Sequence, residues 1–550
     1  MIRYLRWQAL VAVVGVLILG FFLAYLAYST TTVVVPDRGG TYVEGLAGRP
    51  AAINPLFCQY NQVDADLASL IFSGLTKINE KGEVIPDLAQ RWEISKDGLT
   101  YTFYLRDGLL WHDGAPFTAE DVAFTIRSLQ DPDFQGPPEL ATLWQAVRVK
   151  AEGEKVVSFT LPEPFAPFLA HTSLGILPQH LLEGVPPREF LRHPFNLQPV
   201  GTGPFRVVEL TADHILLEAN PHYYGRKPYL ERLEFKFYPD HRAIFNAYGR
   251  GEVEGISQVL AQDLSKVRQE EGLRLYSAPL SSYTLVFLNL KAPVFQEKEV
   301  RQALLWAIDR QRIIDQILDG QGVVAHSPIL PNSWAYNEDI QPYDYDPRRA
   351  KALLDQAGWI DSDQDGVREK EGVPLEFHLL TNEDSLRLRI IEEMAREMAE
   401  VGVRVRTEVL DTPEVVREAL RPRQFTALLY SWGNLPPDPD LYEMWHSTQV
   451  SDEGQNYSGF VNREADELLE AARTTTDRTE RARLYRRFQE IFVEEVPALL
   501  LYYPIYNYAI DERVKGVQLG ALMTPSDRFR TIADWYVKTK RVLVSEAGPS

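Results

Sequence analysis

Residues 425–447 limit the possible folds of this chain more sharply than any other stretch, and they read FTALLYSWGNLPPDPDLYEMWHS. The stretch opens with an apolar run of strand length and composition. Two adjacent prolines follow, and proline cannot continue a central strand. Asp440, with Glu443 three residues later, then predicts a capped helix. The order strand, aromatic loop, helix is typical of an open α/β sheet, in which ligands bind at the carboxyl ends of the strands.

The loop in this stretch favours binding over catalysis. It carries Trp432 and exposed backbone amides, but it contains no pair of nucleophile and general base. An ordinary capped connection is an equally good interpretation of these residues alone. Elsewhere the chain lacks the His-Glu-x-x-His zinc motif, the Gly-x-Ser-x-Gly elbow and the phosphate-binding loop. A secreted hydrolase whose Ser, His and Asp meet only in space stays an alternative.

Length, charge and cysteine content exclude several classes of protein. With 550 residues the chain is too long for one hydrophobic core, so we expect two or three lobes. The net charge of −20 excludes nucleic acid as a partner, because phosphate binding needs a basic surface. Cys58 is the only cysteine, so an intramolecular disulfide and a cysteine metal cluster are both excluded. The aromatic content of 11% suits a broad pocket, although large cores also use aromatic residues.

The N-terminus predicts a membrane anchor. Arg3 and Arg6 precede an apolar segment, residues 7–28, of about the 20 residues that a spanning helix needs. A cleavable signal peptide has a shorter apolar core of about 7–15 residues, so an uncleaved signal anchor is favoured over cleavage near Ser29. With the arginines inside, the rest of the chain is extracytoplasmic. We therefore expect an anchor and spacer over 1–36.

Residues 86–127 read PDLAQRWEISKDGLTYTFYLRDGLLWHDGAPFTAEDVAFTIR. They predict two strands joined by an Asp-Gly turn, and then a helix that Thr118 and Asp121 cap. This block resembles the signature of the family 5 extracellular solute-binding proteins. These are the dipeptide-, oligopeptide- and nickel-binding receptors of ABC importers. The loop at 432–440 is similar to the ligand loop of that family, and the resemblance covers nearly all of residues 39–530.

The resemblance implies an α/β chain with the type II periplasmic-binding-protein fold. Two large lobes would close about a hinge, and a subdomain would be inserted in the first lobe. The implied limits are 37–69, 181–280 and 504–540 for the first lobe, 70–180 for the inserted subdomain, 281–503 for the second lobe and 541–550 for a disordered tail.

The resemblance also implies where the ligand binds and what it is. The implied partners are a peptide or another small solute and the subunits of an ABC permease, and no residue is expected to be catalytic. Peptide-binding members usually carry a loop aspartate that pairs with the peptide α-amine, and Asn434 or Leu435 stands in its place here. A longer peptide held by its backbone, or a non-peptide solute, is therefore favoured. The implied ligand-binding residues are Phe57, Tyr60, Asn61, Tyr283, Trp432, Gly433, Asn434, Leu435, Asp438, Tyr457 and Ser458.

The stretch 361–369, DSDQDGVRE, resembles the front of an EF-hand loop. Its acids stand at positions one, three and five, where carboxylates can converge on one calcium ion. The glutamate expected at position twelve is absent, because Gly372 stands there. We expect no required cofactor; structural calcium is one interpretation and a solvated acidic turn is the other. The candidate ligands are Asp361, Asp363, Asp365, Val367 and Glu369.

The sequence therefore predicts an anchored, extracytoplasmic binding component of an ABC importer. Besides the hydrolase, a chaperone or adhesion-type surface receptor is an alternative. Such a receptor would bind unfolded or surface proteins rather than small solutes.

Overall fold

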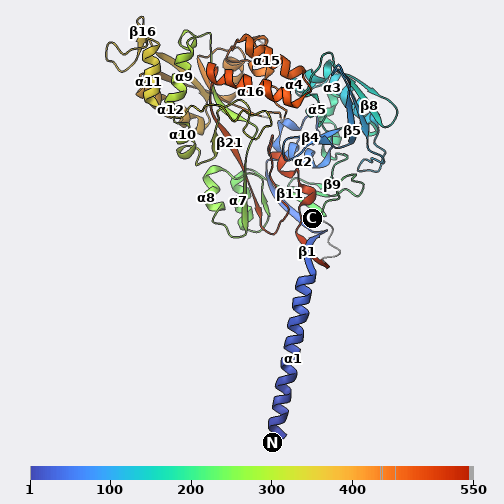
Figure 1. The fold of residues 1–550 in the computed structure, drawn as a ribbon. Helices are drawn as coiled ribbons and strands as arrows, with labels where there is room; N and C mark the ends of the chain where they lie inside the picture. The colour runs from blue at the N-terminus through green and yellow to red at the C-terminus, as the bar shows by residue number, and fades with distance from the viewer. Residues whose placement is uncertain (1, 434, 437, 452–453, 544–550) are drawn as a thin grey trace.

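The computed structural model describes residues 2–433, 435–436, 438–451 and 454–543. Its first helix, α1 (Ile2–Thr31), projects away from the body of the molecule as a long stalk (Figure 1). Across the described chain, no helix combines the length and apolar character needed to cross a membrane. The stalk continues into β1 (Thr32–Asp37), which pairs antiparallel with β22 (Lys538–Leu543). Residues 541–543, which the sequence placed in a disordered tail, are thus part of a strand because β1 offers them a backbone partner.

One mixed sheet of twelve strands runs through the described part of both lobes. Ten of its strands form a continuous path and the other two, β13 and β15, pair with β21. In path order the ten are β19 (Arg404–Leu410), β18 (Glu376–Asn382), β20 (Ala427–Trp432), β14 (Tyr283–Leu288), β21 (Ala498–Asp511), β12 (Gly255–Ile256), β2 (Thr41–Ala47), β11 (Arg232–Tyr238), β10 (His214–Ala219) and β9 (Phe205–Leu210).

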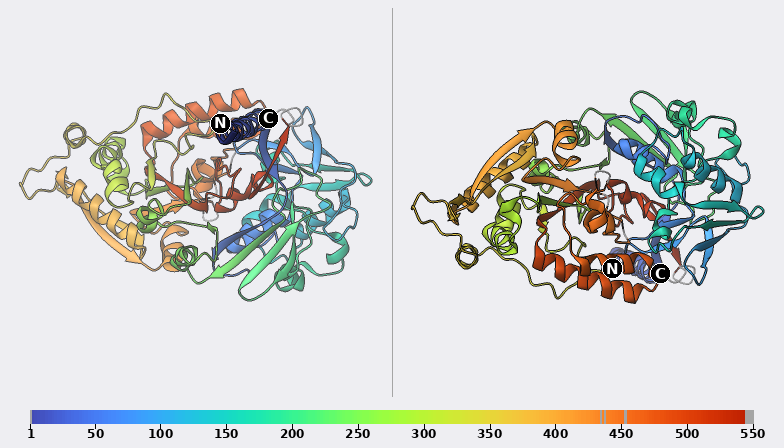
Figure 2. Two further views of the ribbon diagram at one scale, coloured as in Figure 1. Left: turned by 90° about the horizontal axis from the view of Figure 1, so that it is seen from below. Right: turned by 90° about the horizontal axis from the view of Figure 1, so that it is seen from above.

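Strand β21 joins the two lobes. Its first residues pair with β14 and with β15 (Gly322–Val324), whereas its last residues pair with β13 (Leu273–Pro279) and β12. Figure 2 shows this strand between the N-terminal and C-terminal halves of the chain in both views. The chain therefore crosses between the lobes twice, once just before β14 and once within β21.

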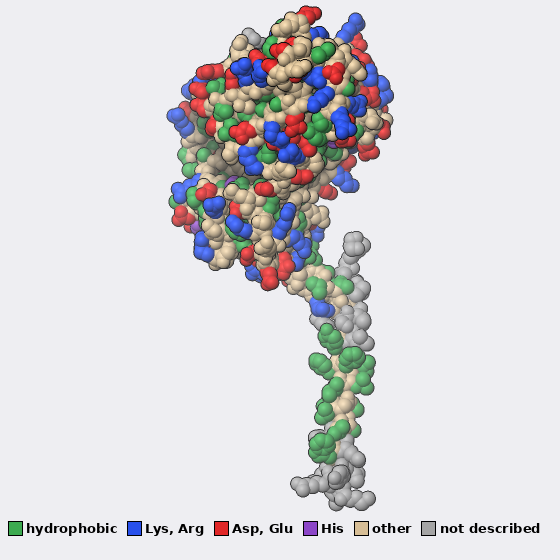
Figure 3. Space-filling model, turned by 90° about the vertical axis from the view of Figure 1, so that its left-hand side faces the viewer, with side chains coloured by type: hydrophobic (Ala, Val, Ile, Leu, Met, Phe, Trp, Pro, Cys, Tyr) green, Lys and Arg blue, Asp and Glu red, His purple; other side chains and the backbone are tan. Residues whose placement is uncertain are grey.

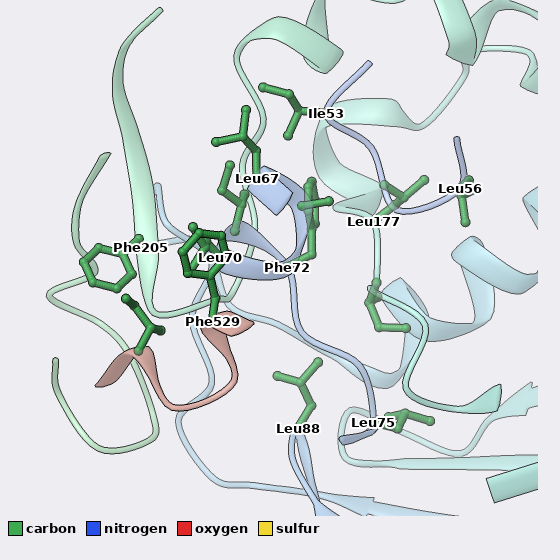
Figure 4. Close-up of a cluster of buried hydrophobic side chains, with 14 of the residues drawn as sticks. Ile53, Leu56, Leu67, Leu70, Phe72, Leu75, Leu88, Leu177, Phe205 and Phe529 are labelled. Carbon is green, nitrogen blue, oxygen red and sulfur yellow. The ribbon is translucent and has the colours of Figure 1, made fainter. Parts of the chain in front are cut away.

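Two separate sets of hydrophobic cores define the lobes. The first lobe draws its cores from residues 42–267 and 506–535, and Figure 4 shows Leu70 of α2 (Gln62–Ile71) beside Phe529 from the end of the chain. The second lobe draws its cores from residues 283–503. The lobe limits expected from the sequence stay a prediction. The first lobe also holds the helices α7 (His241–Gly249) and α8 (Leu264–Val267).

An antiparallel sheet of four strands lies within the expected inserted subdomain. The predicted Asp-Gly turn joins its first two strands, with Gly98 at φ +71°, and the predicted capping box of Thr118 and Asp121 is confirmed. The strands, in sheet order, are β5 (Ala89–Ile94), β6 (Thr100–Leu105), β8 (Val156–Thr160) and β7 (Arg148–Ala151). The remaining elements here are the hairpin β3 (Thr76–Ile78) and β4 (Val84–Pro86) and the helices α3 (Ala119–Gln130), α4 (Pro138–Gln145), α5 (Phe168–His171) and α6 (Gln179–Leu182).

Helices of the second lobe cover its part of the large sheet. The helices α15 (Arg463–Thr474) and α16 (Arg478–Glu495) lie nearest the inserted subdomain, beside α4 and α5 (Figure 1). The others are α9 (Lys298–Ala307), α10 (Arg310–Gln316), α11 (Pro347–Gln356), α12 (Ser385–Glu400), α13 (Thr412–Glu414) and α14 (Tyr442–Trp445). A short hairpin of β16 (Glu369–Lys370) and β17 (Val373–Pro374) projects from the far end.

Candidate ligand-binding cleft

A cleft of about 610 Å³ lies between the two lobes. This volume lies within the range of about 300–1,000 Å³ that is usual for small-molecule sites. Both lobes and the crossings between them line it, so lobe movement would change its shape. The lining residues lie within 59–60, 78–82, 137 and 171 of the first lobe and its insertion, at 281 and within 521–523 near the crossings, and within 328–334, 432–444 and 455 of the second lobe.

The aromatic loop after β20 forms one wall of the cleft. Trp432 is half-buried, and its ring centroid lies 5.8 Å from that of Tyr457, which does not line the cleft. The Leu435 amide donates to the Ser281 carbonyl at 2.9 Å, so the loop is attached to the first crossing. Gly433 is exposed at the wall. Asn434, the expected substitute for the amine-binding aspartate, lies outside the described residues.

The Asp-Pro-Asp segment after this loop is fastened to α16. Arg481 donates to Asp438 through two nitrogen atoms, at 2.8 Å and 2.5 Å, and both side chains are largely buried. The Tyr485 hydroxyl donates to the carbonyl of Pro439. Such a two-bond guanidinium–carboxylate pair fixes geometry as well as charge. Asp438, expected to contact the ligand, pairs with Arg481 and does not line the cleft.

The second aspartate of the segment does line the cleft. Asp440 lies 3.2 Å from Arg473, which also donates to Glu443 at 2.9 Å. Burial raises the pKa of Asp440, and the nearby Arg473 guanidinium opposes that rise. The cap predicted at Asp440 is wrong, because α14 begins at Tyr442 with Leu441 as its N-cap. Asp440 accepts from the Tyr442 amide at 3.3 Å, and Glu443 pairs with Arg473 instead of closing a capping box. This wall therefore presents two carboxylates that share one guanidinium.

Besides Asp438 and Tyr457, four of the expected residues do not line the cleft. Phe57 and Tyr283 are buried in the lobe cores, and the Tyr283 hydroxyl donates to the sulfur of Met444 at 3.2 Å. Asn61 caps α2 by accepting from the Val63 amide at 2.9 Å.

The fourth is Ser458, which is 1% exposed, and its backbone carbonyl accepts from the Leu290 amide. Three of these side chains are buried and Asn61 caps a helix, and their role as ligand-contacting residues stays a prediction. Of the other expected residues, Tyr60, Trp432, Gly433 and Leu435 line the cleft.

Sequence reasoning missed one segment of the cleft wall. Residues 328–334, PILPNSW, contribute Trp334, which the guanidinium of Arg481 faces at 5.2 Å. Two prolines and an aromatic residue resemble the composition of the loop at 432–439, and that signal could have identified the segment. His171 also lines the cleft, and burial lowers its pKa to about 4, so the ring is neutral.

One arrangement resembles a hydrolytic site but has a structural role. His446 lies between the Thr448 hydroxyl at 2.8 Å and the Glu470 carboxylate at 3.1 Å. The Nδ1 atom of His446, which faces the Thr448 hydroxyl, also accepts from the Thr448 amide and so caps the short helix at 447–450. The His446 ring stacks on Tyr442, with 4.1 Å between ring centroids. His446 is 2% exposed and does not line the cleft. A nucleophilic hydroxyl would need an open approach, so this set does not support catalysis.

The acidic loop brings together part of the expected calcium ligand set. Asp361, Asp363 and Glu369 each offer an oxygen atom within 4.8 Å of the others. The Oδ1 atom of Asp361 is buried and has no hydrogen-bond partner among the described residues. Asp365 instead binds Arg404 at 3.1 Å and caps the Val367 amide at 2.8 Å. Three converging carboxylates fit a hard cation such as calcium.

Comparison with known proteins identifies similar chains. Residues 83–452 match the sequence profile of the bacterial extracellular solute-binding proteins, family 5, middle region. The oligopeptide-binding protein AppA of Bacillus subtilis is 32% identical over 490 residues, which cover 88% of this chain and 89% of that protein. Its structure, in complex with a nonapeptide, has a TM-score of 0.71 and covers 92% of this chain and all of that one at 31% identity.

A nickel-binding relative has a similar structure. NikZ of Campylobacter jejuni, in complex with nickel and L-histidine, has a TM-score of 0.72 at 28% identity. The match covers 90% of this chain and 99% of that one.

Proposed function

Because the chain belongs to the bacterial extracellular solute-binding proteins of family 5, we propose that its cleft captures a peptide or a related small solute for an ABC importer. The protein acts outside the cytoplasm and is a binding protein rather than an enzyme. The observation that carries the proposal is the cleft of about 610 Å³ between two lobes that are joined at two crossings. Closure of the lobes around the solute then produces the form that docks on the permease.

The charges of the cleft wall support a ligand that is held by its backbone and apolar groups. Among the described residues of the loop, Asp438 faces Arg481 and Asp440 faces Arg473, so neither carboxylate is free of a cation. A peptide α-amine would have to compete with these guanidinium groups. The aromatic walls at Tyr60, Trp334 and Trp432 offer stacking and apolar contact instead. A longer peptide, or a non-peptide solute such as a metal–amino acid complex, fits this wall better than a free dipeptide.

The stalk supports attachment to the membrane. Between residues 11 and 23 the large apolar side chains of α1 are 46–78% exposed, and Figure 3 shows them around the described part of the stalk. Charged residues of both signs cover the visible face of the body. Exposed apolar surface on this scale needs a partner. We propose that residues 7–28 remain as an uncleaved anchor. Mass spectrometry of the membrane fraction tests this proposal, since recovery of peptides that contain Arg3 or Arg6 supports it and a mature N-terminus near residue 30 overturns it.

Native mass spectrometry of the full chain, purified in mild detergent, tests the function. We expect a retained mass in the range of a peptide or a small complex, which tandem fragmentation then identifies. A panel of synthetic peptides of two to nine residues provides the second step. Stoichiometric binding without turnover supports the proposal. Turnover of the peptides would favour the hydrolase, and binding of unfolded protein alone would favour the chaperone or adhesion role.

A further inference from the structure

Arg473, near the end of α15, contacts residues on both sides of the cleft. Its backbone carbonyl accepts from the Ala166 amide of the inserted subdomain at 2.8 Å. Its guanidinium lies 4.9 Å from the ring centroid of Phe165, the neighbour of Ala166. On its own side the same guanidinium lies 4.4 Å from the Tyr442 ring. One side chain therefore lies between an aromatic ring of the first lobe and one of the second.

The segment that meets Arg473 is held firmly in the inserted subdomain. The Phe165 carbonyl accepts from the hydroxyl of Tyr101, a buried residue of β6, at 3.1 Å. The Phe165 ring stacks on His171, which lines the cleft, with 5.8 Å between centroids. Prolines at 164 and 167 flank Phe165 and Ala166 and limit their backbone freedom. Phe165 therefore presents a fixed surface to the opposite lobe.

Arg473 is oriented just as firmly from within the second lobe. Its guanidinium faces two carboxylates of the cleft wall, Asp440 at 3.2 Å and Glu443 at 2.9 Å. The preceding carbonyl, of Ala472, accepts from Arg481, which also holds Asp438. The cleft wall and the residue that contacts the opposite lobe are therefore parts of one hydrogen-bonded block. A shift of the wall at Asp440 or Glu443 must also shift the guanidinium that faces Phe165.

We infer that Arg473 is a positioning residue that couples the wall of the cleft to closure of the two lobes. A solute that packs against the wall at 440–444 fixes the two carboxylates, these fix the guanidinium, and the guanidinium holds Phe165 of the other lobe. The inference rests on the proposed capture of a solute in the cleft. A cation over an aromatic face is attractive enough to shift a balance between open and closed forms.

A second contact between the lobes is weaker. Arg478 lies 3.5 Å from Glu83, and both side chains are about half exposed. Exposed ion pairs contribute little to stability. Arg478 therefore offers a graded comparison with Arg473. Arg483, an exposed residue of α16 that pairs with Glu480, is the control, since among the described residues no ion pair joins it to the first lobe.

Distance measurements between the lobes test the inference on the full chain in detergent. Spin labels go on cysteines introduced by Lys150→Cys in the subdomain and Arg463→Cys in α15, in a Cys58→Ser background, since both sites are exposed. The variants are Arg473→Met, Arg473→Lys, Phe165→Leu and the double change Arg473→Met with Phe165→Leu. Arg478→Gln and Arg483→Gln are the comparison and the control. Each is measured alone and with pooled synthetic peptides of two to nine residues.

We expect Arg473→Met to lower the ratio of closed to open forms about tenfold, the equivalent of about 1.4 kcal/mol. Phe165→Leu should lower this ratio by a similar factor. The double variant should lower it no more than either single variant does, and Arg478→Gln should lower it by a smaller factor. Arg473→Lys should restore part of the ratio, because it keeps the charge but loses the planar face. A cooperative thermal transition and an unchanged circular dichroism spectrum exclude misfolding, and Phe165→Leu repeats the test from the other lobe if Arg473→Met does not fold.

The inference is overturned if Arg473→Met gives the same distance distribution as the labelled protein without this substitution. It is also overturned if the effects of Arg473→Met and Phe165→Leu on the ratio of closed to open forms add fully in the double variant. Failure of the proposed function gives a different result. In that case the peptide pool leaves the distances of the unsubstituted protein unchanged, while the contrast between Arg473→Met and Arg483→Gln persists without peptide.

Discussion

At the residue scale, arginines on two neighbouring helices determine the shape of one cleft wall. Arg481 holds Asp438 and Arg473 holds Asp440. Because both arginines are mostly buried, their removal would leave carboxylates without partners in a poorly solvated position. The same pairing neutralises charge that could otherwise bind a ligand amine. These two residues therefore stabilise the wall, and their effect on selectivity is part of the proposed function.

Replacement of Arg481 by Met should destabilise the second lobe by about 3–5 kcal/mol, since breaking a buried ion pair leaves one charge uncompensated. Urea unfolding followed by tryptophan fluorescence and circular dichroism measures this loss. Arg483→Gln, an exposed change on the same helix, should stay within about 0.5 kcal/mol. Equal stabilities of the two variants would show that Asp438 does not depend on Arg481.

Replacement of Trp432 by Ala should weaken solute binding about tenfold to a hundredfold, because truncation removes a large aromatic contact at the cleft wall. Isothermal titration with the peptide that native mass spectrometry identifies would measure the change. Trp306→Ala is the matched control, since Trp306 is half-buried against Arg349 at 4.1 Å and does not line the cleft. An affinity equal to that of the unsubstituted protein would remove Trp432 from the binding surface.

At the scale of single elements, α12 carries a buried acid that makes its packing dependent on pH. The Oε2 atom of Glu397 accepts from the Asp309 amide at 3.0 Å, and Oε1 has no hydrogen-bond partner in the described part of the chain. Burial raises the pKa of Glu397 to about 7 from an ordinary value of 4.5. Between these values the folded form retains a proton that the unfolded form has lost.

The stability contribution of Glu397 should therefore fall as pH rises from about 4.5 to 7 and stay low above pH 7. Glu397→Gln should remove this fall and raise stability at pH 8 by a few kcal/mol at most, about 1.4 kcal/mol for each unit of the pKa difference. Urea midpoints at pH 5 and pH 8 measure the effect, with Glu400→Gln as an exposed control on α12. A variant that keeps the pH slope of the original protein would contradict the expectation.

The acidic loop at 361–369 is the second element with a testable property. If Asp361, Asp363 and Glu369 hold calcium, a hundredfold excess of the ion over its Kd should stabilise the protein by about 2.7 kcal/mol. Thermal melts with calcium and with a chelator measure this. Asp363→Asn should abolish the difference, whereas Glu371→Gln, in the same loop but outside the cluster, should keep it. A calcium response equal in both variants would favour the solvated acidic turn.

At the scale of the whole molecule, the stalk lies outside the hydrophobic cores of both lobes. The strands β1 and β22 pair with each other, and Val33, Val34 and Leu543 on them are exposed. Neither strand contributes to the hydrophobic cores. The cores instead use the end of the chain through Arg528, which is fully buried between Glu44 and Asp66 at 2.7 Å and 2.6 Å. We therefore expect the first lobe to need the last part of the chain for folding, but not the stalk.

A chain that begins at residue 38 should keep its fold and lose about 1 kcal/mol or less of stability, because only exposed contacts disappear. Thermal melts in detergent of this chain and the full chain measure the difference. A chain that ends before Arg528 is the opposite control and should not fold. Loss of the cooperative transition in the shortened N-terminal variant would show that the stalk belongs to the first lobe.

Local patterns in the sequence predicted much of this protein. The two strands β5 and β6, the turn at Gly98 and the cap at Thr118 depend on residues a few positions apart, and the structure shows all of them. The aromatic loop after β20 was placed on the cleft wall by resemblance, and Trp432 lines it. The family and its solute-binding role were recognisable for the same reason, since such short-range features persist in sequence.

Only the tertiary structure decided which polar and aromatic side chains face the cleft. Asp438 turns away because Arg481, 43 positions later, holds it, and Tyr283 and Phe57 are used by the cores. Glu443 has the spacing of a capping box but binds Arg473, 30 positions away. Periodicity and spacing describe neighbours within one element, whereas these choices depend on partners that only the packing of distant elements brings within hydrogen-bond distance.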